Sequence, residues 1–283
     1  MAGDLRIVLD GLAFPEGPRW RDGELYFSDM HAHEVVAVRP DGARRTVFRH
    51  DGPVSGLGWL PDGRMLVVSM EDMRLLRLEA DGRAVVHADL SGVATINAND
   101  MVVDARGRAY VGNFGFDLHA GAQPAPARLA RVDVDGSVYE AAADMMFPNG
   151  CVITPDGATL VVGESWGGRL TAFDIGPDGA LSNRRVWAQM DGGAIPDGIC
   201  LDAEGAIWVA SPPTNEAVRV HEGGRVSARV KAERGVYACM LGGAERRTLF
   251  LCTADQSDPA ACAANRTGRI EAIEVDIPGA GLP

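Results

Sequence analysis

The chain has 283 residues, of which 46% are hydrophobic, and carries a formal net charge of −12. A chain of this length and composition can bury a large core without crosslinks, and its dispersed negative charge excludes nucleic acid and anionic lipid as favoured partners. No stretch approaches the roughly 18 apolar residues of a membrane helix, so we expect a cytoplasmic protein with no membrane partner.

Short apolar runs separated by Asp-Gly turns recur along the whole chain. The first repeat, "PEGPRWRDGELYFSDMHAHEVVAVRPDGARRTVFRH", and the second, "VSGLGWLPDGRMLVVSMEDMRLLRLEADGRAVVHADL", each read as four strands. Asp-Gly between alternating runs supplies the positive φ that tight hairpin turns need. Later repeats begin at "NANDMVVDARGRAYVGNF", "FPNGCVITPDGATL", "PDGICLDAEGAIWVASP" and "YACMLGGAERRTLFLCTAD".

Six units spaced by about 40 to 50 residues, the size of one propeller blade, predict an all-β fold. We expect a six-bladed β-propeller with four-stranded blades around a central channel, formed by residues 1–283 as a single domain. A β-sandwich is the competing architecture, but it does not explain the regular repeat. One irregular insertion, "GFDLHAGAQPAPA" at about residues 115–127, is expected to be a long loop over one face.

An apolar-Pro-X-Gly motif occurs three times, as "FPEG", "FPNG" and "IPDG". The X residues Glu16, Asn149 and Asp197 each stand seven or eight residues before the glycine of the next turn, and Asn99, followed by Asp100, has the same offset. The first strand of each blade should line the channel, so residues in equal phase should converge on the axis. Proline would fix φ before each side chain, and glycine would keep the channel uncrowded.

Buried carboxylates without compensation are costly, so the convergence favours a divalent cation. Glu16, Asn149 and Asp197 would be its ligands, with water completing the shell. Oxygen ligands suit calcium, magnesium or manganese and do not exclude zinc or iron(II). Because an isolated Pro-X-Gly is usually a turn, the prediction depends on the three-fold recurrence. The preceding Phe14, Phe147 and Ile195 are interpreted as blade core.

These motifs together resemble the SMP-30/gluconolactonase/LRE-like family of six-bladed lactonase propellers, and the resemblance spans nearly the whole chain. It implies that Glu16, Asn149 and Asp197 hold one divalent ion and that Asp197 is the catalytic base. It also implies that Asn99, in the Asn-Asp pair with Asp100, contacts substrate or ion-bound water. Sugar-lactonase relatives often carry Arg two residues before that Asn, where this chain has Asn97, which predicts broader tolerance of unhydroxylated rings.

Other residues near these motifs are candidates for the pocket. Phe114 and Phe116 suggest a less polar pocket rim, although both could equally be blade core. His119, in the long loop, is the one histidine expected in the pocket, while most of the others should be on the surface. Glu164 and Trp166 could reach the channel mouth, and Ser165 is interpreted as a structural hydroxyl because no nucleophile elbow or placed histidine accompanies it.

The sequence therefore predicts a metal-dependent hydrolase of a small lactone, with an ion that polarises the carbonyl and water activated by Asp197. A non-hydrolytic enzyme like strictosidine synthase and a non-catalytic binding propeller are the alternatives, and neither requires the three oxygen donors in phase. The five cysteines form no C-x-x-C pair and should be buried thiols. Lactone identity, metal identity and oligomeric state stay open.

Overall fold

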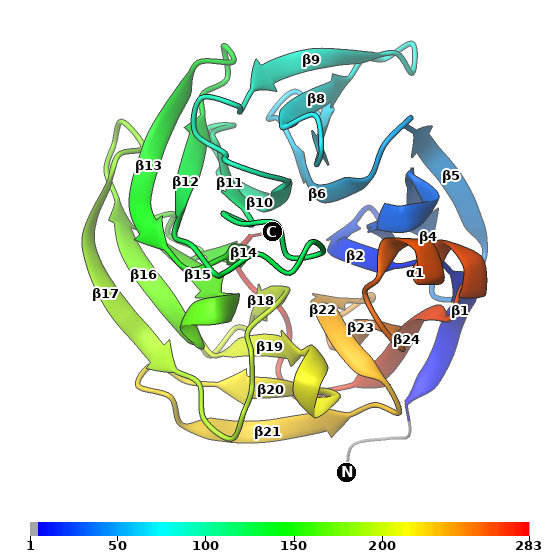
Figure 1. Cartoon of the computed structure of the whole chain (residues 1–283). Coiled ribbons are helices and arrows are strands. Elements are labelled where there is room, and N and C mark those ends of the chain that lie inside the picture. Colours follow the sequence, from blue (N-terminus) through cyan, green and yellow to red (C-terminus); the bar gives the residue numbers. More distant parts are fainter. Residues whose placement is uncertain (1–4, 283) are drawn as a thin grey trace.

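The computed structural model describes residues 5–282. In this part of the chain, 24 strands form six four-stranded antiparallel sheets arranged as blades around a central axis (Figure 1). The predicted six-bladed β-propeller with four-stranded blades is confirmed. In five of the blades the first strand in the chain lies nearest the axis and the last lies at the periphery, whereas in the blade that holds both chain ends β22 is innermost and β1 outermost (Figure 1). None of the helices in residues 5–282 is long and apolar enough to cross a membrane.

The first three blades follow the chain without interruption, each strand pairing with the next. Blade one contains β2 (Pro15–Arg21), β3 (Glu24–Asp29), β4 (Glu34–Val38) and β5 (Arg44–Arg49). Blade two contains β6 (Val54–Trp59), β7 (Met65–Ser69), β8 (Arg74–Leu78) and β9 (Ala84–Asp89). Blade three contains β10 (Ala98–Val103), β11 (Ala109–Asn113), β12 (Ala127–Val132) and β13 (Val138–Met145).

The next two blades repeat this order. Blade four contains β14 (Pro148–Ile153), β15 (Thr159–Glu164), β16 (Arg169–Ile175) and β17 (Leu181–Gln189). Blade five contains β18 (Ile199–Leu201), β19 (Ile207–Ser211), β20 (Glu216–Val220) and β21 (Val226–Lys231). Short 3₁₀ turns connect the second and third strands of blades one, four and five, at Met30–Ala32, Ser165–Gly167 and Pro212–Thr214.

The sixth blade joins the two ends of the chain. It contains β22 (Gly235–Gly242), β23 (Thr248–Ala254) and β24 (Gly268–Glu274), and its outermost strand is β1 (Arg6–Leu12). Arg6 pairs with Ala272 and Leu12 with Gly268. This pairing closes the ring with backbone hydrogen bonds, a feature that the repeat pattern did not reveal because β1 lies before the first repeat.

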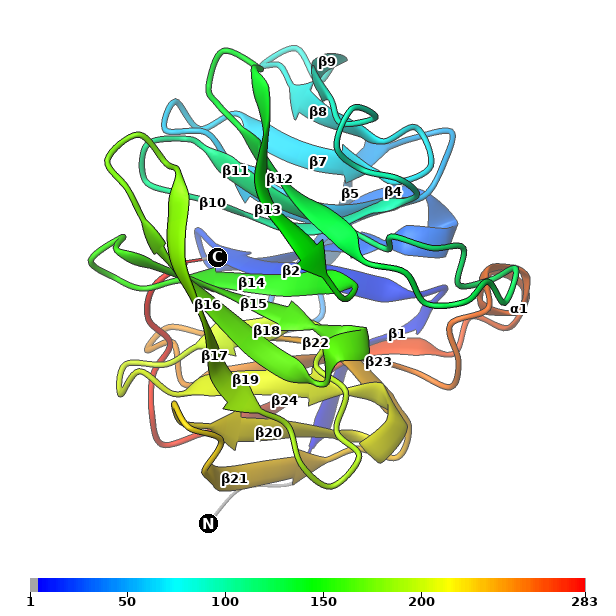
Figure 2. The same cartoon turned by 60° about the vertical axis from the view of Figure 1, so that its left-hand side comes forward.

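Two insertions project from the same face of the ring, where the loop after β11 and the helix α1 (Pro259–Asn265) lie near each other (Figures 1 and 2). The loop is the one predicted for residues 115–127. The helix was not predicted, and it makes the segment between β23 and β24 a second irregular insertion. Its N-cap Asp258 accepts a hydrogen bond from Ala261 N, and proline fills its first position.

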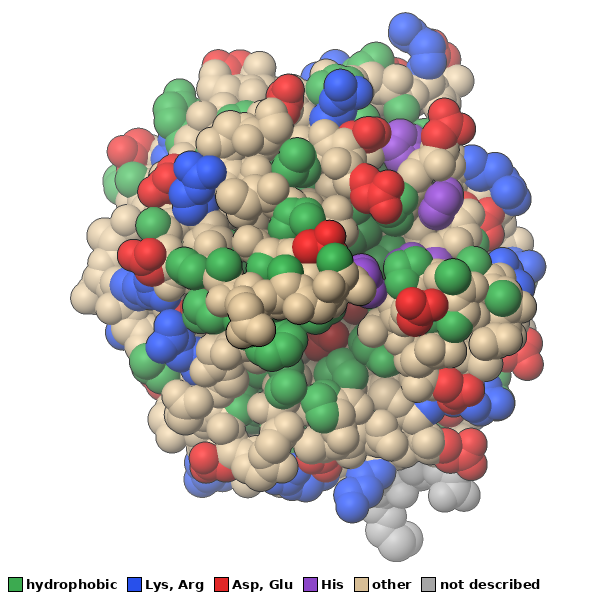
Figure 3. Space-filling view, viewed as in Figure 1, with side chains coloured by type: hydrophobic (Ala, Val, Ile, Leu, Met, Phe, Trp, Pro, Cys, Tyr) green, Lys and Arg blue, Asp and Glu red, His purple; other side chains and the backbone are tan. Residues whose placement is uncertain are grey.

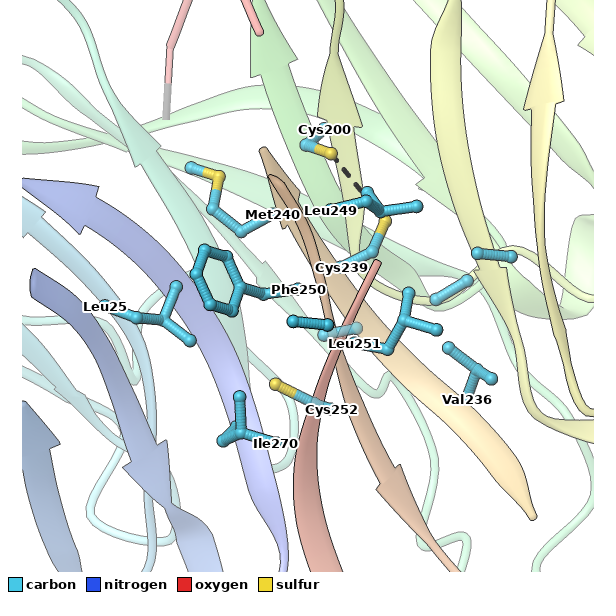
Figure 4. Packing of buried hydrophobic residues seen from close by; sticks show 14 of the residues in the cluster. Leu25, Cys200, Val236, Cys239, Met240, Leu249, Phe250, Leu251, Cys252 and Ile270 are labelled. Carbon is cyan, nitrogen blue, oxygen red and sulfur yellow. Dashed lines mark hydrogen bonds between the residues drawn. The ribbon is translucent and has the colours of Figure 1, made fainter. Parts of the chain in front are cut away.

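Apolar side chains from neighbouring sheets interdigitate between the blades. Figure 4 shows one such cluster, in which Leu25 of blade one lies near Phe250 and Ile270 of blade six. Burial of this apolar surface provides the main stabilisation of the ring. The five cysteines are buried and free, as predicted from their spacing.

Candidate active site

The inner strands bring four of the predicted oxygen donors to one cavity. Glu16 lies on β2, Asn99 on β10 and Asn149 on β14, and Asp197 stands two residues before β18. All four line a cavity of about 100 Å³. The equal offsets in the sequence thus correspond to convergence of four blades on one space near the axis.

A local irregularity of the inner strands orients these side chains. Strand pairing shifts register between Glu16 and Arg19 on β2, and between Pro148 and Cys151 on β14. A similar shift on β10 follows Ala98. Such bulges bend a strand and redirect the side chains beside them. The candidate ligands therefore stand where the regular ladder is interrupted.

Hydrogen bonds connect the donors across adjacent blades. Asn149 Nδ2 donates to Asp197 Oδ1 at 2.5 Å and to Ser165 Oγ at 3.2 Å. Ser165 Oγ in turn donates to Pro196 O at 2.7 Å, which supports its interpretation as a structural hydroxyl. These bonds fix the Asn149 amide so that Oδ1 is its atom available to a cation.

The backbone around Asp197 is held on both sides. Gly150 N donates to Asp197 O at 3.2 Å, and Gly198 N donates to Tyr237 O at 2.8 Å. A Cβ on Gly150 would lie 2.5 Å from Ile199 N, and one on Gly198 would lie 2.4 Å from the Cβ of Ala238. Glycine is needed here because the next blade approaches closely, rather than only to keep the channel uncrowded as the sequence suggested.

Both carboxylates of the set favour their protonated forms in the absence of a cation. Burial raises the pKa of Glu16 well above its ordinary value, and the neighbouring carboxylates of Asp197 and Asp100 raise it further. Burial also raises the pKa of Asp197 to about 8, opposed by the hydrogen bond from Asn149 and assisted by Asp100. A divalent cation would reverse this penalty, because opposite charge favours the ionised carboxylate.

The donor chemistry fits a hard divalent cation. Within residues 5–282, no group of three or more His, Cys, Asp or Glu side chains is placed to hold a metal ion. The set here instead combines two carboxylates with an amide oxygen, which suits oxygen-preferring cations. None of the described residues that line the cavity is Lys or Arg, so no protein cation offsets the two carboxylates from within it.

Asp100 differs from the sequence-based expectation. Although it follows Asn99, it does not line the cavity with the other donors. Its Oδ1 instead forms a buried ion pair with Arg19 Nη2 at 2.6 Å and accepts a hydrogen bond from Met101 N at 2.8 Å. Alternation along the strand directs its side chain away from the cavity lining and toward Arg19, which is not where the expected substrate contact would place it. Asn99 Oδ1 accepts a bond from Ser55 Oγ at 3.3 Å.

Aromatic side chains form the wall of the cavity. Phe14 and Phe147, interpreted from the sequence as blade core, line it together with Phe114. They belong to a hydrophobic cluster that is separate from the main blade cores and also contains Phe116. Figure 3 shows hydrophobic side chains around a central hollow on this face, with acidic and histidine atoms visible inside. Ile195, also interpreted as core, is 38% exposed.

These rings contact one another in a continuous series. Phe114 stacks on Phe147 with centroids 4.4 Å apart, and Phe116 meets Phe147 edge-on at 5.8 Å. Trp166, 49% exposed, meets Phe116 edge-on at 5.4 Å. The expected position of Trp166 near the mouth agrees with this contact. Glu164 is fully buried and pairs with Arg169 at 2.9 Å, so it does not reach the mouth.

His31 and Tyr237 are among the cavity residues that the sequence did not suggest. His119 lines the cavity as expected, and His31, which was grouped with the surface histidines, lines it too. Burial and the nearby His119 lower the pKa of His31 to about 4, so its ring is neutral at neutral pH. Tyr237 packs edge-on against Phe14 at 4.6 Å. Neither residue lies in a Pro-X-Gly motif. The one sequence feature that could have placed His31 in a cavity is the insertion that forms α1, because this helix packs beside His31.

Asn97 lies next to the main cavity rather than in it. It adopts a positive φ of 33° and lines a neighbouring cavity of about 160 Å³. The two cavities share Met30, His31, Phe114 and His119. Asn97 is therefore close to the substrate space but not beside the four oxygen donors.

Comparisons with known proteins agree with this architecture. The model of the SMP-30/Gluconolactonase/LRE-like region matches residues 14–255. The 6-deoxy-6-sulfogluconolactonase of Pseudomonas putida is 24% identical over 287 residues, covering 98% of this chain and 96% of the relative. The pentonolactonase XacC of Haloferax volcanii is 26% identical over 255 residues, covering 88% and 84%.

A solved structure supports the fold independently. The structure of a calcium-binding protein, regucalcin, from Agrobacterium tumefaciens has a TM-score of 0.82 to this chain. The two are 21% identical, and the alignment covers 99% of this chain and 96% of the other. At this identity the likeness concerns the fold.

Proposed function

Since the chain belongs to the SMP-30/gluconolactonase/LRE-like family, we propose that it is a lactonase that hydrolyses small γ- or δ-lactones with one divalent cation. The cation would be held by Glu16, Asn149 and Asp197. One observation carries the proposal: the buried carboxylate of Glu16, the partly buried carboxylate of Asp197 and the amide oxygen of Asn149 face one cavity that has no described Lys or Arg in its lining. The lactonase names of the aligned relatives support the reaction class.

The oxygen donors indicate the class of cation that the site would bind, and they do not single out one ion. Calcium, magnesium and manganese suit the oxygen donors, and zinc or iron(II) is compatible with them. A bound divalent ion would supply Lewis-acid polarisation of the lactone carbonyl. Three protein ligands leave room for water and substrate, as in catalytic rather than structural sites.

Asp197 is assigned the role of general base. Its carboxylate would take a proton from the water that adds to the carbonyl carbon, and would return that proton to the ring oxygen as the acyl C–O bond breaks. The product is the hydroxy acid. Asn149 orients this carboxylate through the 2.5 Å hydrogen bond to Oδ1, which leaves Oδ2 to face the water.

Asn99 would orient the substrate or the attacking water. It stands on the third blade of the same cavity, and its Oδ1 is held by Ser55 Oγ. The Nδ2 group is then the donor that can be directed into the cavity. No serine or cysteine nucleophile is required, which agrees with the engaged hydroxyl of Ser165.

Removal and replacement of metal tests the proposal. Protein treated with a chelator should lose hydrolysis of a lactone panel, followed with a pH indicator, and single divalent ions should restore it. The same ions should raise the thermal midpoint of unfolding, because they bind the native state. Hydrolysis that is unaffected by complete metal removal would contradict the cation-dependent mechanism.

A further inference from the structure

We propose that the cavity selects neutral lactones with an apolar aryl or alkyl substituent over polyhydroxylated or anionic sugar lactones. This inference rests on the proposed lactonase function and adds the chemical class of its substrate. It follows from three properties of the cavity wall: its aromatic surface, its lack of a free cation and its small number of polar atoms.

The aromatic surface is the first property. Phe14, Phe114 and Phe147 line the space beside the oxygen donors, together with Met30 and Leu118. The rings of Phe114 and Phe147 stack on each other with centroids 4.4 Å apart, and together they give the cavity a continuous apolar wall. A substrate ring that packs against it would gain contact and lose unfavourable hydration, whereas a hydroxyl directed at the same surface would lose hydrogen bonds to water.

The charge of the wall is the second property. Among the described residues, neither the main cavity nor its neighbour is lined by Lys or Arg. Arg19, below the site, is fully engaged with Asp100 Oδ1 and the carbonyls of Met101, Leu57 and Pro18. No guanidinium therefore remains to bind a substrate carboxylate or sulfonate in the way that charged recognition requires.

The neighbouring cavity also disfavours substrates with an anionic substituent. Its volume of about 160 Å³ is of the size that admits one benzene-like ring. It shares Met30 and Phe114 with the main cavity, and the exposed Asp51 and Glu71 also line it. An apolar substituent can extend into it, whereas an anionic substituent would meet two carboxylates.

The polar atoms of the wall are the third property. Apart from the four oxygen donors, they belong to His31, His119, Tyr237 and Ser257. The ring of His31 also packs against Phe14 at 5.2 Å. A sugar lactone carries a hydroxyl on nearly every ring carbon, and a hydroxyl that faces Phe14, Phe114 or Phe147 would have no side-chain partner there. The lactone ester itself needs only the catalytic donors.

A matched panel of lactones tests the inference with the full chain reconstituted with the divalent ion that supports most activity. The panel contains unsubstituted δ-valerolactone, aryl-fused dihydrocoumarin, an alkyl-substituted δ-lactone, glucono-δ-lactone and a carboxylated sugar lactone. Each kcat/KM is divided by the rate constant for hydroxide-catalysed hydrolysis, which removes intrinsic reactivity. We expect the aryl and alkyl lactones to exceed both sugar lactones at least ten-fold on this scale.

Substitutions of cavity-lining residues test whether these side chains cause the preference for apolar lactones. Leu118→Asn, on the loop after β11, should lower the ratio of aryl lactone to δ-valerolactone several-fold, mainly through KM. Phe114→Leu should do the same by removing the stacked ring. The matched control Phe48→Leu changes a partly buried ring on β5 that lines neither cavity, and should leave the ratio unchanged. The thermal midpoint with ion present verifies that each variant is folded.

The outcomes separate the two proposals. Hydrolysis of δ-valerolactone together with an equal or higher normalised rate for glucono-δ-lactone overturns the substrate class and leaves the lactonase function standing. If none of the lactones is hydrolysed with any ion, the proposed function fails. Calorimetry with non-hydrolysable lactams then decides the cavity preference: tighter binding of the aryl-fused lactam than of a hydroxylated lactam supports it, and the reverse order overturns it.

Discussion

Arg19 and Asp100 form a buried ion pair directly below the candidate active site, with 2.6 Å between Nη2 and Oδ1. The same guanidinium donates to the carbonyl of Leu57 at 3.0 Å, so it connects the inner strands of three blades. The pair offsets part of the charge of a third carboxylate near Glu16 and Asp197, one that still raises the pKa of both. Two uncompensated carboxylates then remain in the cavity, matching the charge of one divalent ion.

Removal of Arg19 alone should destabilise the ring. Arg19→Met leaves Asp100 buried without its partner, which costs about 3–5 kcal/mol in the free energy of unfolding. The double variant Arg19→Met with Asp100→Asn should recover part of this loss, as measured by urea unfolding. The control Arg45→Met breaks the exposed pair with Glu24 and should cost about 0–1 kcal/mol. A double variant no more stable than Arg19→Met would argue against the charge-balance role.

Asp197→Asn tests the assignment of the base. Asparagine keeps an oxygen for the cation but cannot accept the proton, so kcat should fall by about 10²–10⁴ while the ion still raises the thermal midpoint. The matched control Asp191→Asn changes an exposed carboxylate in the segment just before it and should retain full turnover. Near-normal kcat in Asp197→Asn would remove this residue from the mechanism.

Gly198→Ala should disturb the site through backbone packing. The new Cβ would lie 2.4 Å from the Cβ and 2.7 Å from the Cα of Ala238, so the inner strands of blades five and six must separate. Overpacking of this kind costs about 1–3 kcal/mol, and the shift of the adjacent Asp197 should weaken cation binding. Gly92→Ala is the control, because a Cβ added at Gly92 would meet no atom within 4 Å. Unfolding and cation titrations that do not distinguish the two variants would contradict this account.

Cation binding should depend on pH through Asp197. Its pKa is raised to about 8 without a cation, against about 3.9 in an unfolded chain. The folded state therefore binds this proton more tightly, and the cation-free protein loses stability as pH rises from about 4 to 8. A cation must displace this proton, so Asp197 should contribute up to about ten-fold per pH unit to the rise in affinity below pH 8, and the raised pKa of Glu16 adds to the dependence.

Calorimetric titration of the chelator-treated protein at pH 6, 7, 8 and 9 measures this dependence. Asp197→Asn should remove the part of the slope that Asp197 contributes and leave the part that comes from Glu16, and Asp191→Asn should preserve the whole slope. Equal affinity at all four pH values in the unmodified protein would show that proton release from Asp197 does not accompany binding.

The repeat pattern predicted the six blades because it is local. Asp-Gly turns and alternating apolar residues determine where each strand begins and ends, and these signals lie within a few residues of one another. The phase of Glu16, Asn99, Asn149 and Asp197 also predicted their common cavity, since equal positions in equivalent blades occupy equivalent places around an axis. Closure by β1 was not predicted, because its partner β24 is at the other end of the chain.

The sequence by itself thus determined the blades and the oxygen donors that meet at the axis, through signals repeated at short range. Only the tertiary structure decided which neighbours surround those donors. Asp100 pairs with Arg19, 81 residues away in the chain. Phe14 and Phe147, which were expected in the blade core, line the cavity. These outcomes depend on bulges and on packing between separate blades, where the energies of distant side chains, rather than local preference, select one arrangement.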